Sequence, residues 1–235
     1  MVKQRYAQVA QEASCCSGIT GAPRNRALAE RMGYTEEELL RVPESILNSF
    51  AGCGNPLAID DLKDGEVVLD LGSGAGLDCF LAAGRVGPRG KIIGLDMTEE
   101  MLAKAEANRG KMGLGNVEFR LGEMEKMPVE DGSVDAIISN CVINLSPEKE
   151  KVFREAYRVL KPGGRMMISD MVLEKELPPE VKGDPQAWAS CIAGAVLERE
   201  YLKMMEEAGF VNVEVLSRKP FGAVVSAKIR AVKKF

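Results

Sequence analysis

The spacing of apolar and polar residues changes character near residue 65 of this chain. Beyond that point, short apolar runs bounded by glycine, proline or aspartate alternate with longer segments of helical periodicity. The short runs predict strands over residues 67–71, 91–96, 117–121, 134–139 and 165–173. The longer segments predict helices over residues 76–86, 98–112, 147–160 and 199–208, with Lys161-Pro162-Gly163-Gly164 as a stop. Such alternation is typical of a mostly parallel sheet with helices on both faces.

Two more apolar stretches, 211–216 and 223–232, predict a closing pair of strands and complete a doubly wound, seven-stranded, Rossmann-like α/β sheet. Residues 174–197 interrupt the pattern with three prolines, and we interpret them as a cap insert. The composition of residues 188–196 within this insert is compatible with a helix. The predicted core domain therefore covers residues 65–235.

Residues 1–64 predict a helical and irregular segment that packs on this domain. Prolines divide it into short pieces, and Thr35 followed by Glu38 has the spacing of a capping box at a helix start. Ile46, Leu47 and Phe50 form an apolar face at helical spacing. A glycine-flanked loop, Gly52-Cys53-Gly54, follows.

Composition narrows the class of partner. The net charge is −4 and no basic run occurs, which argues against nucleic acid or an anionic membrane as the main partner. No apolar stretch approaches the ~20 residues that span a bilayer, and no secretory signal is visible, so we expect a cytoplasmic protein. The chain has six cysteines and no histidine. In a reducing compartment a disulfide framework is not expected, so each cysteine needs its own interpretation.

A glycine-rich turn follows the first predicted strand. Asp70 stands near the end of that strand, and Gly72, Ser73, Gly74 and Gly76 follow it before a helix. Glycine permits both the tight turn and the close approach of a ligand to the backbone. Asp96 ends the second strand, where such folds place an acid against a ribose diol.

This arrangement resembles the class I S-adenosylmethionine methyltransferases over about residues 65–232. The resemblance implies that the glycine turn passes under the methionyl part of the donor, Asp96 binds the ribose and Met97 lies against the adenine. Glu123 or its backbone would lie near the adenine amino group. The full donor set that we expect is Asp70, Gly72, Ser73, Gly74, Gly76, Asp96, Met97, Gly122, Glu123 and Asn140. A nicotinamide-binding domain is the alternative, but its glycines normally run Gly-x-Gly-x-x-Gly, whereas this spacing is Gly-x-Gly-x-Gly.

The cysteines indicate the acceptor. Cys141 follows the fourth strand, and ligands of doubly wound sheets bind beyond the carboxyl ends of strands, so Cys141 should face the transferable methyl group. Cys191 lies in the cap insert, which could fold over this face and bring it to Cys141. Burial as a small apolar residue is the alternative for Cys141 and Cys191. Cys53 lies in its glycine-flanked loop, where a thiol is not expected to fill a core. Cys79 lies among apolar helix residues and is interpreted as structural.

Several thiols around one methyl-donor site favour a soft metalloid substrate. Structural zinc is the competitor, but these cysteines lack a Cys-x-x-Cys spacing and the chain offers no histidine. Cys15 and Cys16 are adjacent, and neighbours in sequence make a strained disulfide, so a reduced reactive pair is the better interpretation.

The Gly52-Cys53-Gly54 loop, the run Ser139-Asn140-Cys141-Val142-Ile143-Asn144-Leu145 and the later Cys191 together resemble the arsenite S-adenosylmethionine methyltransferases. The resemblance covers nearly the whole chain. It implies that Cys141 and Cys191 hold trivalent arsenic, and we expect Cys53 as a third ligand. Cys53 and either Cys15 or Cys16 would also serve in redox chemistry and substrate delivery.

The implied substrate is arsenite or its thiol conjugates. The implied partner is a thiol reductant such as thioredoxin or glutathione, because methylation oxidises arsenic and a disulfide formed in reducing it must be reopened. Two alternatives stay open: an O- or C-methyltransferase acting on a small molecule such as a quinone precursor, and a metalloid-binding sensor without enzyme activity.

Overall fold

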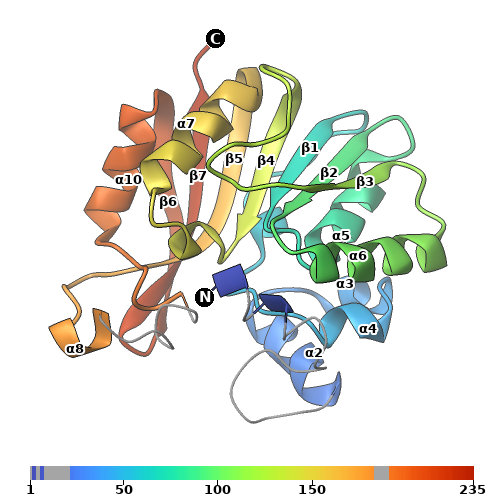
Figure 1. The fold of residues 1–235 in the computed structure, drawn as a ribbon, viewed down its shortest axis with the longest axis horizontal. Coiled ribbons are helices and arrows are strands. Elements are labelled where there is room, and N and C mark those ends of the chain that lie inside the picture. Colours follow the sequence, from blue (N-terminus) through green and yellow to red (C-terminus); the bar gives the residue numbers. More distant parts are fainter. Residues whose placement is uncertain (1, 4–5, 8–21, 183–190) are drawn as a thin grey trace.

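One seven-stranded sheet organises the chain (Figure 1). The computed structural model describes residues 2–3, 6–7, 22–182 and 191–235. The strand order is β3-β2-β1-β4-β5-β7-β6. The strands are β1 (Val67–Leu71), β2 (Lys91–Asp96), β3 (Val117–Leu121), β4 (Val134–Asn140), β5 (Leu160–Val172), β6 (Phe210–Phe221) and β7 (Val224–Lys233). Strands β1 to β5 pair in parallel, whereas β7 is antiparallel to both β5 and β6. The predicted doubly wound, mostly parallel sheet is confirmed.

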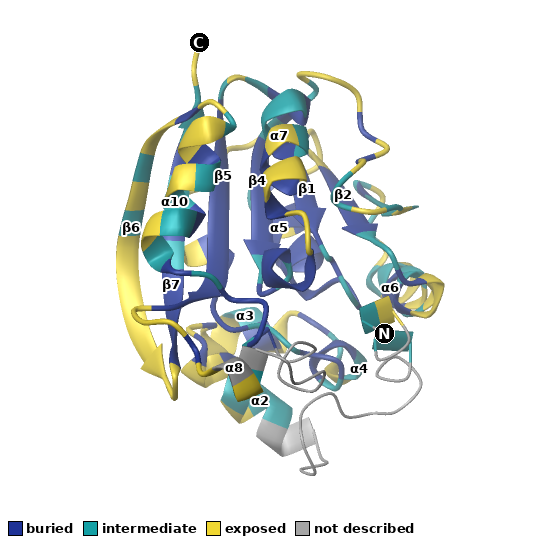
Figure 2. Cartoon of the chain, turned by 60° about the vertical axis from the view of Figure 1, so that its left-hand side comes forward, coloured by how far each residue is buried: buried dark blue, intermediate teal, exposed yellow. Residues whose placement is uncertain are grey.

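Helices cover both faces of the sheet because successive strand residues point to opposite sides. Leu69 and Leu71 belong to one buried cluster with α7 (Lys149–Val159) and α10 (Glu198–Glu207). Val68, the residue before Leu69, belongs to a second cluster with α5 (Leu77–Val86). The helix α6 (Glu99–Met112) contacts β2 and β3. Figure 2 shows the central strands buried between these helices.

The N-terminal elements lie below the carboxyl ends of the strands (Figure 1). They are α2 (Ala22–Arg31), α3 (Glu36–Leu40), α4 (Glu44–Leu47) and the 3-10 turn η1 (Pro56–Ala58). The predicted capping box is confirmed. The Thr35 side chain accepts a hydrogen bond from the Glu38 backbone N–H, and the Glu38 side chain accepts one from the Thr35 backbone N–H. Ile46, Leu47 and Phe50 are buried in the same cluster as α5. These elements therefore form one wall of any site at this edge of the sheet.

Two sequence expectations about local structure differ from the structure. The helix predicted to stop at Lys161-Pro162-Gly163-Gly164 does stop there, because α7 ends at Val159, but the fifth strand begins at Leu160 rather than at residue 165. The segment is an irregular part of β5: Val134 pairs with Leu160, and the register shifts before Ala136 pairs with Arg165. Gly163 has φ 76°, a backbone conformation that lets the strand bulge.

The described part of the expected helix over residues 188–196 is not helical. Residues 191–194 form a turn instead, and Leu197 bridges Leu173 in parallel. A Cβ atom on Gly194 would lie 2.1 Å from the carbonyl oxygen of Asn144, so the turn packs directly on the segment that follows β4. Close packing against that backbone overrides the weak helical pattern. Short elements η2 (Ile143–Leu145) and α8 (Pro179–Lys182) flank this region.

Among the described residues, no helix has the length and apolar character needed to cross a bilayer.

Candidate active site

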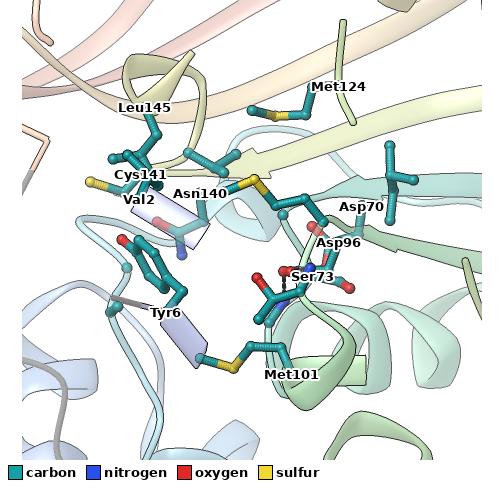
Figure 3. A pocket seen from close by; sticks show the side chains of 18 of the residues that line it. Val2, Tyr6, Asp70, Ser73, Asp96, Met101, Met124, Asn140, Cys141 and Leu145 are labelled. Atoms are coloured by element: carbon teal, nitrogen blue, oxygen red, sulfur yellow. Dashed lines mark hydrogen bonds between the residues drawn. The ribbon is translucent and has the colours of Figure 1, made fainter. Parts of the chain in front are cut away.

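A cavity of about 790 Å³ opens beyond the carboxyl ends of β1, β2 and β4. Figure 3 shows Asp96 and Ser73 on one side of it, with Asn140 and Cys141 on the other. Val2 and Tyr6 also line it, so the beginning of the chain contributes to its wall. The residues of the expected donor set that line the cavity are Asp70, Gly72, Ser73, Gly74, Asp96, Met97, Gly122, Glu123 and Asn140. Gly76 does not line it and instead precedes α5 as the N-cap, with φ 96°.

The glycine turn has the backbone conformation that its sequence predicts. Gly72 and Gly74 have φ 64° and 52°, values in the left-handed region that favours glycine. A Cβ atom on Gly72 would lie 2.4 Å from Cγ2 of Val142, whereas one on Gly74 would meet nothing within 4 Å. The turn is thus fixed on one side by the residue after Cys141 and open toward the cavity on the other.

Polar groups in the cavity wall are arranged around the Asp96 carboxylate. Its Oδ2 accepts a hydrogen bond from the Gly74 backbone at 2.9 Å, and its Oδ1 accepts one from the Thr98 backbone at 2.9 Å. Burial raises the pKa of Asp96 although these bonds oppose the shift. The buried hydroxyls of Ser73 and Thr98 find no hydrogen-bond partner among the described residues. A polar ligand in the cavity would satisfy them.

Below the turn, Asp70 is buried and accepts a hydrogen bond from the Cys79 thiol at 3.1 Å. Burial, with the Asp78 carboxylate as the next contribution, raises the pKa of Asp70 well above its usual range. Cys79 is itself fully buried in α5. It belongs to a different apolar cluster from Cys53, Cys141 and Cys191. This position fits the structural role expected for Cys79.

Three thiols from distant parts of the chain meet at the Cys141 end of the cavity. Cys53, Cys141 and Cys191 belong to one buried cluster, and the Sγ atoms of Cys53 and Cys141 lie within 4.8 Å of each other. The Cys191 thiol also donates to the Cys141 carbonyl oxygen at 2.9 Å, and Cys53 Sγ lies 3.5 Å from the Ser169 carbonyl oxygen. Exposed fractions are 4% for Cys53, 7% for Cys141 and 3% for Cys191. We call these three residues the thiol cluster.

Burial favours the neutral form of two thiols in this cluster, Cys53 and Cys141. Burial raises the pKa of Cys53, with the Asp170 charge acting in the same direction. For Cys141, the hydrogen bond with Cys191 lowers the pKa, but the bond with Cys53 and burial outweigh it and raise the pKa well above its usual value. A ligand that exchanges with neutral thiols suits such a site better than one that requires several buried thiolates.

Asp170, which was not among the residues expected from the sequence, lies beside the thiol cluster. One of its carboxylate oxygens and the Sγ atoms of Cys53 and Cys141 all lie within 4.8 Å of one another. Its carboxylate accepts from Asn144 Nδ2 at 2.9 Å, from the Met171 backbone at 2.8 Å and from the Tyr201 hydroxyl at 3.2 Å. Burial raises the pKa of Asp170 to about 6. Its signal in the sequence is an acid near the carboxyl end of an apolar strand, which is where ligands of this architecture bind.

Asn140 lies between the two halves of the site. It lines the cavity, and its side-chain amide also holds the loop that carries Cys53. The two remaining candidate thiols, Cys15 and Cys16, lie outside the described residues.

A sheet of this order, with a glycine turn after β1 and an acid at the end of β2, defines a class I S-adenosylmethionine-dependent methyltransferase. In agreement, the family described as "Methyltransferase domain" matches residues 62–209. The arsenite methyltransferase of Halobacterium salinarum is 46% identical over 92% of this chain and 58% of its own length. That of Aquipseudomonas alcaligenes is 40% identical over 80% of this chain and 56% of its own length.

Among solved structures, the arsenic (III) S-adenosylmethionine methyltransferase from Chlamydomonas reinhardtii matches with a TM-score of 0.70 and 34% identity, over 93% of this chain and 75% of that chain. The chain belongs to the methyltransferase domain family and, within it, to the family of the arsenite methyltransferases. It spans little more than half the length of the curated relatives named above.

Proposed function

We propose that this chain transfers a methyl group from S-adenosylmethionine to trivalent arsenic bound by Cys141, Cys191 and Cys53. The observation that carries the proposal is the convergence of these three buried thiols at one end of the cavity. The family relationship supports it, because the relatives named above bear this activity in their names. Nothing in a nicotinamide site or an ordinary O- or C-methylation site requires such a cluster.

The cavity residues fit the methyl donor. The open side of Gly74 leaves room for the methionyl part against the backbone, and Asp96 retains lone pairs for the ribose hydroxyls. Ser73 and Thr98 offer buried hydroxyls that lack protein partners. Met97 and Glu123 would bound the adenine. When bound, the donor supplies an electrophilic methyl group on its sulfonium sulfur.

The thiol cluster suits a neutral trivalent ligand. Arsenite, As(OH)3, exchanges its three hydroxyls for three thiols and releases three waters, so three As–S bonds form without leaving a net charge in the buried site. Zinc would instead have to share its site with several thiolates and the Asp170 carboxylate, which leaves excess negative charge in a buried place. Sulfur ligands also match the softness of arsenic.

The chain needs no general base for this transfer. The lone pair of thiol-bound arsenic carries no proton, and the cluster's task is to hold that lone pair toward the cavity at a reacting distance of roughly 3–3.5 Å. This agrees with a chain that contains no histidine. Methylation oxidises arsenic from the trivalent to the pentavalent state, a loss of two electrons.

A pair of thiols that closes to a disulfide returns two electrons and restores trivalent arsenic. Cys53 with either Cys15 or Cys16 is the pair that we propose for this step. An external thiol reductant such as thioredoxin or glutathione then reopens the disulfide. Turnover should therefore depend on such a reductant, whereas the first methyl transfer should not.

Incubation with arsenite, labelled S-adenosylmethionine and a thiol reductant, followed by speciation of the arsenic, tests the proposal. We expect labelled methylarsenicals from the wild type and at least a 100-fold loss in Cys141→Ser and in Cys191→Ser. Cys79→Ser is the matched control, because Cys79 is a buried thiol outside the cluster, and it should keep its activity. Near wild-type activity in either cluster variant would contradict the proposal.

The same experiment separates the other functions. An O- or C-methyltransferase would label no arsenic and would survive alkylation of its cysteines. A metalloid sensor would bind arsenite without binding the donor in calorimetry.

A further inference from the structure

Cys53 is carried by residues 51–54, a loop outside any helix or strand, which we call the Cys53 loop. The side-chain amide of Asn140 fixes this loop at three backbone points. Its Oδ1 accepts from the Cys53 N–H at 3.0 Å and the Gly54 N–H at 3.3 Å, and its Nδ2 donates to the Gly54 carbonyl at 2.8 Å. Asn140 lies more than 80 residues from the loop in sequence. The loop has no regular secondary structure to hold it. The Ser226 hydroxyl on β7 donates one further hydrogen bond, to the Cys53 carbonyl at 2.7 Å, so the amide supplies three of the four side-chain hydrogen bonds that the described residues make to the loop backbone.

The amide is itself fixed from the other side. Asn140 Nδ2 lies 2.9 Å from the Tyr34 hydroxyl and 3.2 Å from Asp78 Oδ2, and the Tyr34 hydroxyl donates to Asp78 Oδ1 at 2.7 Å. Tyr34 and Asp78 are both buried. Because the acceptors surround the nitrogen and the N–H donors surround the oxygen, the network leaves one orientation for the amide.

The contact between loop and amide is close. A Cβ atom on Gly52 would lie 2.4 Å from Asn140 Nδ2, so no larger residue fits there without displacing the amide. Asn140 is also the residue immediately before Cys141. The side chain that binds the Cys53 loop therefore belongs to the residue next to Cys141. This arrangement sets the position of the Cys53 thiol relative to the Cys141 thiol.

We propose that Asn140 is the positioning residue that supplies Cys53 as the third arsenic ligand, and so sets the site's preference for arsenicals with three exchangeable positions. This inference rests on the proposed function. Asn140 does not touch the reacting atoms in this role but acts through the loop that it holds. The contact between Cys141 and Cys191 does not involve the Asn140 side chain. It joins the residue that follows β4 to the turn of residues 191–194.

Two trivalent arsenicals separate the roles of the thiols. Arsenite exchanges three hydroxyls and can use all three thiols of the cluster. Phenylarsine oxide has one carbon bound to arsenic, exchanges the two remaining positions and releases one water on binding two thiols. Cys141 and Cys191 suffice for it, so its binding should be indifferent to where Cys53 lies.

The test measures the affinity of the full chain for both arsenicals, without methyl donor, in the wild type, Asn140→Ala, Cys53→Ser and the double variant. We expect Asn140→Ala to weaken arsenite binding about tenfold, to the level of Cys53→Ser, and to change phenylarsine oxide binding by less than twofold. In the Cys53→Ser background, Asn140→Ala should have no further effect on arsenite, because coupled residues do not act additively. Equal losses for both arsenicals, or no loss of arsenite affinity, would overturn the proposal.

A second variant alters one side of the amide. Asn140→Asp keeps the acceptor for the Cys53 and Gly54 N–H groups, but it loses the donor to the Gly54 carbonyl and sets a carboxylate against Asp78. We expect this variant to weaken arsenite binding at least threefold and to change phenylarsine oxide binding by less than twofold. A loss of phenylarsine oxide affinity equal to that of arsenite would also overturn the role of Asn140.

The proposed function and the role of Asn140 would be refuted by different results. Wild-type chain that binds arsenite through three thiols but yields no labelled methylarsenical would refute the activity alone. A chain that methylates arsenite while Asn140→Ala loses both arsenicals equally would refute only the role of Asn140.

Discussion

The Cys191 thiol donates a hydrogen bond to the backbone carbonyl of Cys141, and both residues have a left-handed backbone, with φ 61° and 59°. A residue with a Cβ atom is uncommon in this region and costs roughly 1–2 kcal/mol there. Such outliers persist where surrounding structure holds them. The two thiols that meet across the site thus both stand on strained backbone, which aims them at each other.

This strain predicts an unusual order of stability. At Cys141, replacement by glycine should leave the protein about 1 kcal/mol more stable than replacement by alanine, because glycine adopts positive φ without cost. The control is Cys79, in the first turn of α5, where glycine should be the less stable by about 0.5 kcal/mol. Urea unfolding of the four variants measures both differences. The same sign at both positions would contradict the assignment of strain to Cys141.

The glycine turn predicts a steric effect on donor binding. In Gly72→Ala the new Cβ would lie 2.4 Å from Val142 on backbone with φ 64°, so the turn must shift. We expect calorimetry to show at least tenfold weaker binding of S-adenosylmethionine. Gly110→Ala is the matched control, because Gly110 is exposed in α6 with nothing within 4 Å of its added Cβ. That control should bind normally and gain about 0.5–1 kcal/mol of stability; unaltered binding in Gly72→Ala would refute the prediction.

The buried carboxyl of Asp78 predicts how stability depends on pH. Burial raises its pKa from 3.8 to about 6, so the folded state holds this proton more tightly than the unfolded state does. The resulting contribution is fully present below about pH 4 and is lost as the pH rises to about 6, by up to about 3 kcal/mol. Asp78→Asn still accepts from Tyr34 and cannot titrate. The stability of the wild type relative to this variant should therefore fall between pH 4 and 6 and then level off; a difference that is constant with pH would contradict the shift.

Most of the fold could be predicted because its signals are local. The strands of the parallel sheet are short apolar runs closed by turn residues, and Thr98 and Thr35 mark helix starts directly in the sequence. The bulge in β5 and the turn at Cys191 could not be predicted this way. Both depend on partners far along the chain: Val134 and Ala136 for the bulge, and the Asn144 carbonyl for the turn.

The residues of the site likewise differ in whether a local sequence signal indicates them. Position at the carboxyl end of a strand located Asp96 and Cys141, and the glycine pattern located the turn. The same signal was present for Asp170 but was not used, whereas the sequence has no comparable signal for Tyr34 or Asp78, whose importance comes from hydrogen bonds between distant segments. Asn140 was expected only to contact the donor, and its grip on the Cys53 loop depends on contacts across more than 80 residues.

The central claim is that arsenic is held by thiols alone. The most direct measurement is X-ray absorption at the arsenic K-edge for the full chain mixed with one equivalent of arsenite in the absence of methyl donor. We expect three sulfur neighbours around arsenic and no oxygen, falling to two sulfurs and one oxygen in Cys53→Ser. Arsenic that keeps two or more oxygen neighbours in the wild type, or a sulfur count unchanged in Cys53→Ser, would contradict it.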